Sequence, residues 1–205
     1  MKKSNFKKAF ALSALMAFVI TGSAYAESIK VDANDSEYKR DNITVEASDK
    51  FDNAGTVIAE DSITVNGGTF NNTGTITTGT LEIYSNPNDK ADIAGSINAS
   101  QGFIYRGINS NLYDRKLYAE LDTPVLHIIG TTNQTGLQIM NNDVLTNVDK
   151  IIVESQGEKT GLVITNNEQI DITAPIYLKY NSDADKDARV EVYSGATLTA
   201  DKIIA

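Results

Sequence analysis

The stretch from Phe51 to Ile83, FDNAGTVIAEDSITVNGGTFNNTGTITTGTLEI, nearly repeats itself. FDNAGTVIAEDSITV is followed by FNNTGTITTGTLEI, and the matched pairs are Phe51 and Phe70, Asn53 and Asn72, Gly55 and Gly74, and Thr56 and Thr75. These residue types offer little catalytic chemistry. The repetition therefore indicates a structural unit that recurs along the chain.

Short β-branched and apolar runs extend this pattern at roughly even spacing. They are Ile43-Thr44-Val45, Ile63-Thr64-Val65, Leu81-Glu82-Ile83 and Phe103-Ile104-Tyr105. In the first three runs, apolar side chains flank a polar one, so the outer two are expected to face a core and the middle one to face solvent. Further short runs follow Gly55, Gly74 and Gly95.

The second half of the chain repeats with a longer period. TGLQIMNNDVLTNVDKIIVES begins at Thr135, and the similar TGLVITNNEQIDITAPIYLKY begins at Thr160. The last segment, SGATLTADKIIA from Ser194, is similar to NAGTVIAEDSITV from Asn53. The chain thus ends within a strand-like repeat, and we expect it to be truncated at its C-terminal end.

A period of about 20 residues, with two or three short strands in each repeat, is typical of stacked coils. Stacking places Ile over Ile at about 4.8 Å and creates a core that one coil cannot form alone. We predict an all-β fold, a parallel β-helix (β-solenoid) of about seven to nine coils over residues 42–205. Glycine is expected at corners with positive φ, and stacked asparagines are expected to hydrogen-bond between coils. An antiparallel sandwich also has short, regularly spaced strands, but its strands do not repeat one another in sequence.

Residues 1–26 have the pattern of a secretory signal peptide. Four lysines at positions 2, 3, 7 and 8 precede an apolar run over 9–20. Ala24-Tyr25-Ala26 then matches an A-x-A processing site, with cleavage expected before Glu27. A retained membrane anchor is disfavoured, because the run is shorter than the ~20 residues that span a bilayer. Residues 27–41 are predicted to be a mobile N-terminal segment, and no membrane span is expected in the mature chain.

The composition excludes several classes of function. The chain carries a net charge of −9, and removal of the four lysines before Glu27 would make it −13. Such a surface repels nucleic acid and anionic membranes. The absence of cysteine excludes disulfides, thiolate metal sites and cysteine nucleophiles.

Residues 107–121, GINSNLYDRKLYAEL, do not fit the repeat. We predict an irregular insertion between the short-period and the longer-period coils. Its aromatic and basic residues Tyr113, Arg115 and Tyr118, with the neighbouring Tyr105 and Arg106, make it the candidate contact surface. The alternative is a loop whose tyrosines only cover the end of a core column.

Catalytic and metal-binding patterns are weak. His127 is the single histidine, and alternation places it opposite Leu126 and Ile128, which favours solvent exposure over a catalytic role. Asp183, Asp185 and Asp187 stand at alternate positions, as in a calcium loop. The continuation lacks the glycine and the bidentate glutamate that such a loop needs, so a solvated loop is the preferred interpretation.

The combination of a signal peptide with Asn-x-Gly-Thr-Ile and Ile-Thr-Val coils resembles the passenger region of bacterial autotransporters and related β-helical surface adhesins. The resemblance covers most of residues 42–100, in FDNAGTV, FNNTGTI and IAGSI, and residues 135–205 more loosely. It implies a right-handed β-helix, transit through the periplasm of a Gram-negative bacterium, and display at the cell surface or release outside the cell. Such proteins end in a membrane β-barrel of strands of ~9–11 residues, so this chain is expected to be a truncated or split member.

We expect a structural or adhesive role without catalytic residues or cofactors. The expected partners are the export machinery, and then a host glycan or matrix or further copies of the chain. One alternative is a polysaccharide lyase or hydrolase on a β-helix, for which a pair of acids is needed among Asp52, Glu60, Asp61, Glu82 and Asp92. Another is a small secreted module that binds glycans or self-assembles. A glycan-binding face should gather several tyrosines, whereas a stalk should scatter them.

Overall fold

The computed structural model describes residues 23–25, 28–35, 37–85, 92–107, 115–131, 135–156, 160–164, 169–180, 187–193 and 195–205. Within these ranges the only helical element is the 3₁₀ turn η1 (Asn142–Leu145), and every strand pair is parallel. The predicted all-β parallel solenoid is therefore confirmed.

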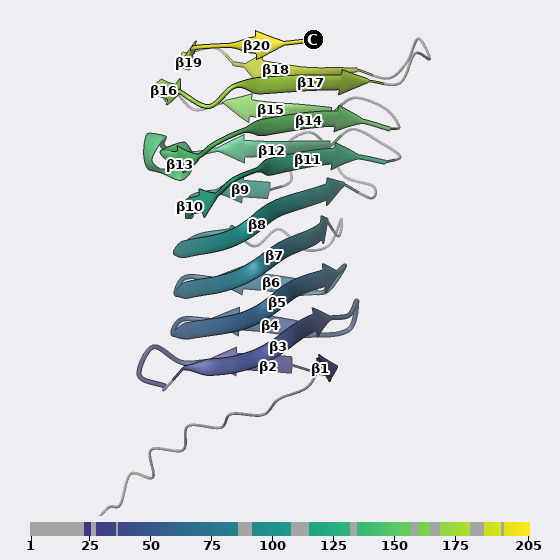
Figure 1. Ribbon diagram of the computed structural model, residues 1–205, viewed down its shortest axis with the longest axis vertical. Helices are drawn as coiled ribbons and strands as arrows, with labels where there is room; N and C mark the ends of the chain where they lie inside the picture. The colour runs from purple at the N-terminus through teal and green to yellow at the C-terminus, as the bar shows by residue number, and fades with distance from the viewer. Residues whose placement is uncertain are drawn as a thin grey trace, which may run out of the picture.

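One sheet follows the whole length of the molecule (Figure 1). Its strands, in spatial order, are β1 (Ser23–Tyr25), β3 (Tyr38–Val45), β5 (Thr56–Asn66), β7 (Thr75–Ser85), β8 (Ser96–Gly107), β11 (Leu126–Gly130), β14 (Ile151–Ser155), β17 (Ile176–Tyr180) and β20 (Ile203–Ile204), with β10 (Glu120–Thr123) and β13 (Asn147–Val148) beside them. We call this the long sheet.

Three shorter sheets complete the coils. They are β2 (Ser28–Val31), β4 (Lys50–Asn53) and β6 (Thr69–Asn72); β9 (Arg115–Leu117), β12 (Thr135–Ile139), β15 (Thr160–Ile164) and β18 (Ala188–Val192); and β16 (Gln169–Ile172) with β19 (Thr197–Ala200). In Figure 1 the long-sheet strands run from left to right in front, and strands such as β4 and β12 return behind while the chain climbs. This is the sense of a right-handed helix.

The solenoid makes about six turns, slightly fewer than the seven to nine predicted. Among the described residues, the back of the coil between β6 and β9 forms isolated bridges at Ile93 and no strand of its own, and β20 is a short strand in the last coil. The coils also lengthen along the chain. Near the start Ile43 pairs with Ile63, whereas near the end Ile176 pairs with Ile203, so the later turns take up more of the sequence.

The strand register follows the repeats in the sequence. Ile43, Ile63 and Leu81 stack in one fully buried column, while the residues between the apolar ones face outward. In the second half, β12 and β15 pair from Thr135↔Thr160 through Ile139↔Ile164, which is the offset predicted from the repeat. Burial of such apolar columns is the main source of stability of the coils.

Two side-chain ladders join β4 to β6. The rings of Phe51 and Phe70 are stacked with centroids 5.0 Å apart. The amide of Asn53 donates a hydrogen bond to the side-chain oxygen of Asn72 at 2.7 Å, with both residues buried. The prediction that stacked asparagines bond from coil to coil is confirmed.

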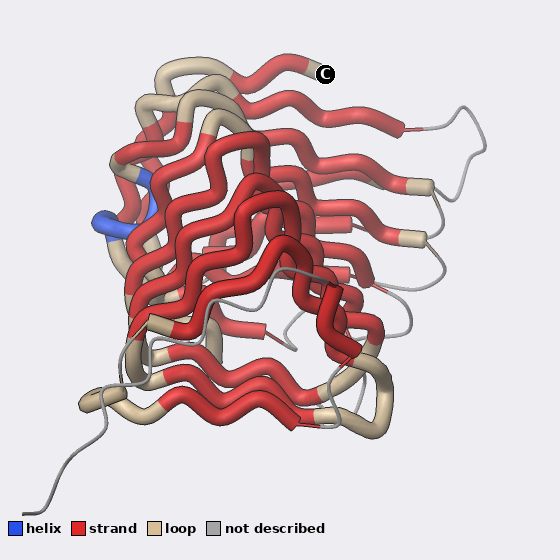
Figure 2. Tube along the Cα trace, turned by 60° about the horizontal axis from the view of Figure 1, so that its bottom comes forward, coloured by secondary structure: helices blue, strands red, loops and turns tan. Residues whose placement is uncertain are grey.

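The corners of the coils are built differently in the two halves (Figure 2). The long strands β5 and β7 bend at register irregularities, between Ala59 and Ser62 in β5 and between Thr78 and Thr80 in β7. In the second half the corner interrupts the strand, and the prolines at 124 and 175 stand in the gaps. Proline fits there because it has no N–H to give to the ladder.

The glycines at the corners have two physical roles. Gly95 has a φ of 78°, as predicted for a corner. Positive φ was also expected at Gly55 and Gly74, but that prediction is wrong, because neither is among the glycines with positive φ. A Cβ on Gly74 would lie 2.2 Å from the carbonyl oxygen of Gly55, and one on Gly55 would lie 2.6 Å from that of Asp32. These two glycines are therefore required by the close approach of successive coils.

Two stretches predicted to be irregular contain strands. Within residues 27–41, β2 pairs with β4 and the start of β3 pairs with β5, so this segment belongs to the solenoid. Within residues 107–121, β9 and β10 join the stack, while residues 108–114 lie outside the described residues. β9 and β10 each bury only two alternate side chains, and one of these is Arg115. The apolar alternation that would predict a strand is therefore weak in both.

The predicted signal peptide lies mostly outside the described residues, which include only 23–25 of the first 27. This short strand, β1, pairs with β3 through Ser23↔Asn42 to Tyr25↔Thr44. It stands immediately before the predicted cleavage position.

Candidate functional site

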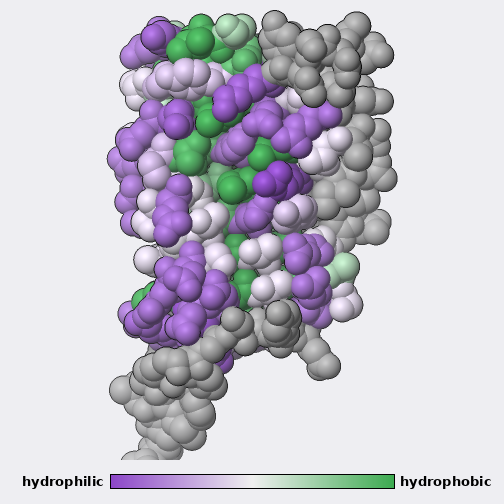
Figure 3. Space-filling view, turned by 45° about the vertical axis from the view of Figure 1, so that its right-hand side comes forward, coloured by the Kyte–Doolittle hydropathy of each residue, from purple (hydrophilic) through white to green (hydrophobic). Residues whose placement is uncertain are grey.

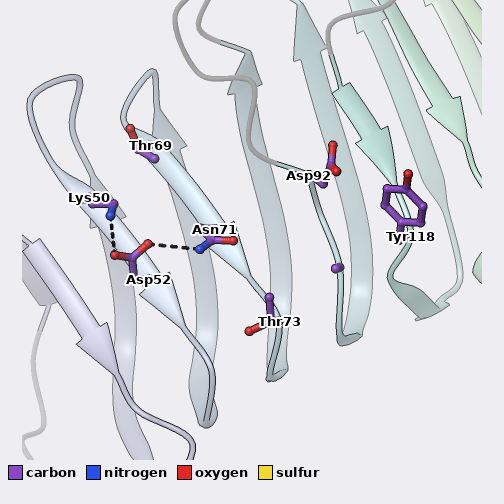
Figure 4. Close-up of a pocket in the computed structure, with 8 residues that line it drawn as sticks. Lys50, Asp52, Thr69, Asn71, Thr73, Asp92 and Tyr118 are labelled. Atoms are coloured by element: carbon purple, nitrogen blue, oxygen red, sulfur yellow. Dashed lines mark hydrogen bonds and ion pairs between the residues drawn. The ribbon is translucent and has the colours of Figure 1, made fainter.

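A cleft of about 550 Å³ lies on the back of the solenoid, opposite the long sheet (Figure 4). Its lining residues come from β4, β6 and the two following coil segments, and they are Lys50, Asp52, Thr69, Asn71, Thr73, Asp92, Ala94 and Tyr118. We call this cleft the back groove. Its volume is within the range of about 300–1,000 Å³ that is usual for ligand sites.

Strand pairing places the groove residues in rows along the axis. Asp52 pairs with Asn71, and the bridge between Asn72 and Ile93 brings Asp92 next in the same row. The bridge between Ile93 and Leu117 then adds the coil that carries Tyr118. Four successive coils at about 4.8 Å make a site ~14 Å long. These outward residues alternate with buried ones, so the groove is a direct consequence of the strand pattern.

Hydrogen bonds connect the polar end of the groove. The ammonium of Lys50 lies 2.6 Å from a carboxylate oxygen of Asp52. The side-chain amide of Asn71 donates to the other oxygen of Asp52 at 3.4 Å. Tyr118 stands at the opposite end, and it is 37% exposed. The groove therefore offers a charged pair, an amide and a phenol ring on one surface.

The predicted contact residues do not form one surface. Tyr105 and Arg115 are fully buried, so the prediction that they contact a partner is wrong. Arg106 lies on the outer face of the long sheet, where it pairs with Glu82 and lies over the ring of Tyr84. Tyr113 lies outside the described residues. Of the set, only Tyr118 lines the back groove.

The described tyrosines are scattered over the solenoid. Tyr105 is in the core, Tyr118 is in the back groove and Tyr193 is close to the C-terminus, whereas other strands of the long sheet carry Tyr25, Tyr38, Tyr84, Tyr177 and Tyr180. The back groove thus does not gather the several tyrosines expected of a glycan-binding face, and Tyr118 is the one aromatic residue among those that line it. Any aromatic contact at the back groove must therefore come from one ring.

His127 is half-buried on the outer face of the long sheet, as alternation predicted. Its Nε2 lies 3.0 Å from a carboxylate oxygen of Glu154. Burial lowers the pKa of His127 below its usual value, and the attraction of Glu154 only partly opposes this. Burial pushes the pKa of Glu154 up, but the hydrogen bond from Gln156 and the attraction of His127 outweigh it and hold that pKa below its usual value.

The outer face of the long sheet also carries an aligned column of mainly apolar residues. Strand pairing stacks Ile104, His127, Ile152, Tyr177 and Ile204, all of which are partly exposed. Figure 3 shows apolar residues in a broken column along the long axis, between hydrophilic neighbours. The column lies on a sheet surface without a cleft described at it, so it is a weaker candidate for a ligand site.

The calcium candidate is mostly untested, because Asp183 and Asp185 lie outside the described residues. Asp187 is exposed and lies 3.6 Å from the guanidinium of Arg189. No group of three or more His, Cys, Asp or Glu side chains within the described ranges is arranged to hold a metal ion.

The acids proposed for a hydrolase are held in surface contacts. Glu60 lies 2.8 Å from Lys39, Glu82 pairs with Arg106, and Asp61 accepts a hydrogen bond from Asn42 at 3.3 Å. Asp52 and Asp92 are the two of the set that share the back groove.

Comparison with models of known protein families, with characterised proteins and with solved structures gives no match. Among the residues that the structure describes, there is no helix with the length and apolar character of a membrane span. The site must therefore be interpreted from its own chemistry.

Sequence reasoning missed the back groove as a unit. The signal was present, because the repeat that aligns Phe51 with Phe70 also aligns Asp52 with Asn71. Tyr118 could not be added from this alignment, since its coil shares no motif with β4 or β6. The bridges at Ile93 supply that connection.

Proposed function

We propose that this chain is an exported, non-catalytic β-solenoid that acts by surface contact, as the passenger region of an autotransporter-like adhesive protein. The observation that carries the proposal is the back groove, an outward-facing cleft on a regular stack of coils. The signal-peptide pattern of residues 1–26 and the coil motifs support export and display.

A polysaccharide hydrolase is the second candidate, and a specific pair of residues favours it. Asp52 and Asp92 line the same groove two coils apart, so their backbones are separated by ~10 Å. Inverting glycosidases hold their carboxyl groups about 6.5–9.5 Å apart. Asp52 is held by Lys50 and Asn71, however, and this arrangement suits a fixed binding residue better than one that must exchange protons.

Export is tested by expressing the whole chain, with a C-terminal tag, in a Gram-negative host. The expected result is a processed protein outside the cytoplasm whose N-terminal residue is Glu27. Unprocessed protein that remains in the cytoplasm would contradict the export part of the proposal.

Adhesion is tested with the exported protein coated on beads, which are exposed to purified polysaccharides and to extracellular-matrix proteins. The expected result is retention of at least one of these polymers without cleavage, measured as unchanged reducing ends and unchanged absorbance of unsaturated sugars. Release of new ends would replace the adhesive proposal with the hydrolase or lyase. Failure to retain any of the polymers would overturn the adhesive role.

A further inference from the structure

We propose that the back groove binds a neutral, hydroxyl-rich oligosaccharide that lies parallel to the solenoid axis. The inference rests on the proposed function, because it names the ligand of the surface through which the chain would act. It also assigns roles to four residues: Asp52, Asn71 and Asp92 as hydrogen-bonding groups, and Tyr118 as the ring against which one sugar packs.

The shape of the groove sets the orientation of the ligand. The row from Asp52 through Asn71 to Asp92 follows successive coils, and the coil of Tyr118 comes next. A linear ligand that contacts all of these must therefore run along the axis, across the strands. At ~14 Å this row has the length of a short oligosaccharide.

The hydrogen-bonding groups of the groove match hydroxyl groups. A carboxylate only accepts hydrogen bonds, an amide side chain both donates and accepts, and a threonine hydroxyl does either. Along the groove, Asp52 and Asp92 thus offer acceptors, and Asn71 between them offers both a donor and an acceptor. Thr69 and Thr73 lie beside them. Because each sugar hydroxyl can donate and accept, a polyhydroxylated chain can satisfy every position.

The charges of the groove disfavour anionic ligands. Lys50 is the one cation among the described lining residues, and it is already paired with Asp52 at 2.6 Å. Asp92 adds a further negative charge, so the lining carries more acid than base. A phosphate, sulfate or uronate would therefore meet a net negative charge at this lining.

Most residues that line the groove are polar, but carbon atoms make up the larger part of its lining surface. Ala94 and the ring of Tyr118 are its apolar lining residues. A tyrosine offers an apolar face with a polar tip, which suits a ligand that has both C–H faces and hydroxyl groups. An apolar peptide or a lipid chain would leave most of the polar row without partners, at a desolvation cost.

The test measures binding of defined hexasaccharides to the exported full chain by isothermal titration calorimetry. The probes are cellohexaose, maltohexaose and mannohexaose, with hexagalacturonate as the anionic comparison. We expect at least one neutral hexasaccharide to bind, with an affinity that changes less than twofold between low and high salt, because salt screens only charged contacts. Binding of hexagalacturonate alone would overturn the inference.

The variants Tyr118→Ala and Asn71→Ala are expected to weaken the binding about tenfold and about threefold, respectively, since aromatic residues dominate such contacts. Tyr193→Ala is the matched control, because Tyr193 is also exposed, at 38%, and does not line the groove. Asn71→Ala removes only an exposed side chain, so it keeps the test usable if Tyr118→Ala does not fold.

The outcomes separate the inference from the proposed function. Neutral-sugar binding that survives both groove variants, or that is lost equally in Tyr193→Ala, would overturn the groove assignment but leave adhesion intact. If none of the hexasaccharides binds while matrix proteins are retained by the coated beads, the ligand class is wrong and the adhesive role stands. If nothing is bound in either assay, both fail.

Discussion

The asparagine ladder between β4 and β6 offers a sharp test of how the coils are held together. Asn72 is fully buried, and its side-chain amide donates to the carbonyl of Ala94 at 2.6 Å while its oxygen accepts from Asn53 at 2.7 Å. We expect Asn72→Ala to destabilise the protein strongly, because the bond from Asn53 is buried between the coils and the bond to Ala94 is partly buried.

The magnitude follows from the groups that lose their partner. The carbonyl of Ala94 loses its side-chain donor, and the amide of Asn53 keeps only its bond to the carbonyl of Thr75 at 3.1 Å. The buried Asn53 amide should cost about 1–3 kcal/mol and the partly buried Ala94 carbonyl less, so the variant should lose roughly 3 kcal/mol. For a domain of this size that corresponds to a melting temperature lower by about 6–12 °C.

The assay is thermal unfolding followed by far-ultraviolet circular dichroism, with Asn71→Ala as the control. Asn71 is the adjacent residue in β6, but it is exposed and makes one hydrogen bond of 3.4 Å, to Asp52. Its replacement should cost less than about 0.5 kcal/mol. A melting temperature for Asn72→Ala within about 2 °C of the wild type, or equal losses for the two variants, would refute the ladder as a source of stability.

The inward columns and the charge pairs provide further tests. Ile63→Asp should unfold the neighbouring coils because it buries an unpaired charge at a fully buried position. Thr77→Asp, at an exposed position between Ile58 and Asn98, should shift the melting temperature by less than about 2 °C. Retention of the native circular dichroism signal and melting temperature by Ile63→Asp would count against this placement. Stability should also fall on acidification. The pKa of His127 is lowered in the folded protein, so below about pH 6.5 the unfolded chain binds a proton that the folded chain does not. The free energy of unfolding therefore falls as the pH is lowered from about 6.5 to the folded pKa. The lowered pKa of Glu154 gives stability that is present above about pH 4.5 and is lost as the pH falls through the folded pKa. The positive charges of Lys179 and Arg106 also lower the pKa of His127. Lys179 lowers the pKa of Glu154 as well. Urea unfolding midpoints between pH 7.5 and 5 should decline less in His127→Gln than in the wild type, and equal declines would show that His127 does not contribute.

The fold was predictable because the same few residue types recur at fixed offsets. Ile43, Ile63 and Leu81 begin runs of similar pattern, and they stack in the structure. The strand register is strongly determined, because a shift of one residue would turn all the apolar side chains of a strand toward solvent. The offset between Thr135 and Thr160 was readable for the same reason.

The site was less predictable, because its residues share a row and not a motif. Asp52 and Asn71 differ in type although they occupy equivalent positions, and Tyr118 comes from a coil that did not resemble the others. The burial of Arg115 was also unexpected, since charged side chains usually face solvent. Here an alternating strand pattern places the arginine inward, between positions that the sequence suggested were a loop.

The isolated bridges at Ile93 have a consequence for the behaviour of the chain under load. Hydrogen bonds between stacked coils point along the axis, so a pull on the two ends of the solenoid would open them one coil at a time. On the long sheet, β7 and β8 are paired from Thr75 to Ser85, with one register irregularity between Thr78 and Thr80. On the opposite side, the described chain has no continuous strand at the same level and is joined by the bridges at Ile93 and by single hydrogen bonds, such as those between Asn72 and Ala94. We therefore expect a tensile weak point at this level, so that the back of the solenoid yields first and the long sheet acts as its hinge.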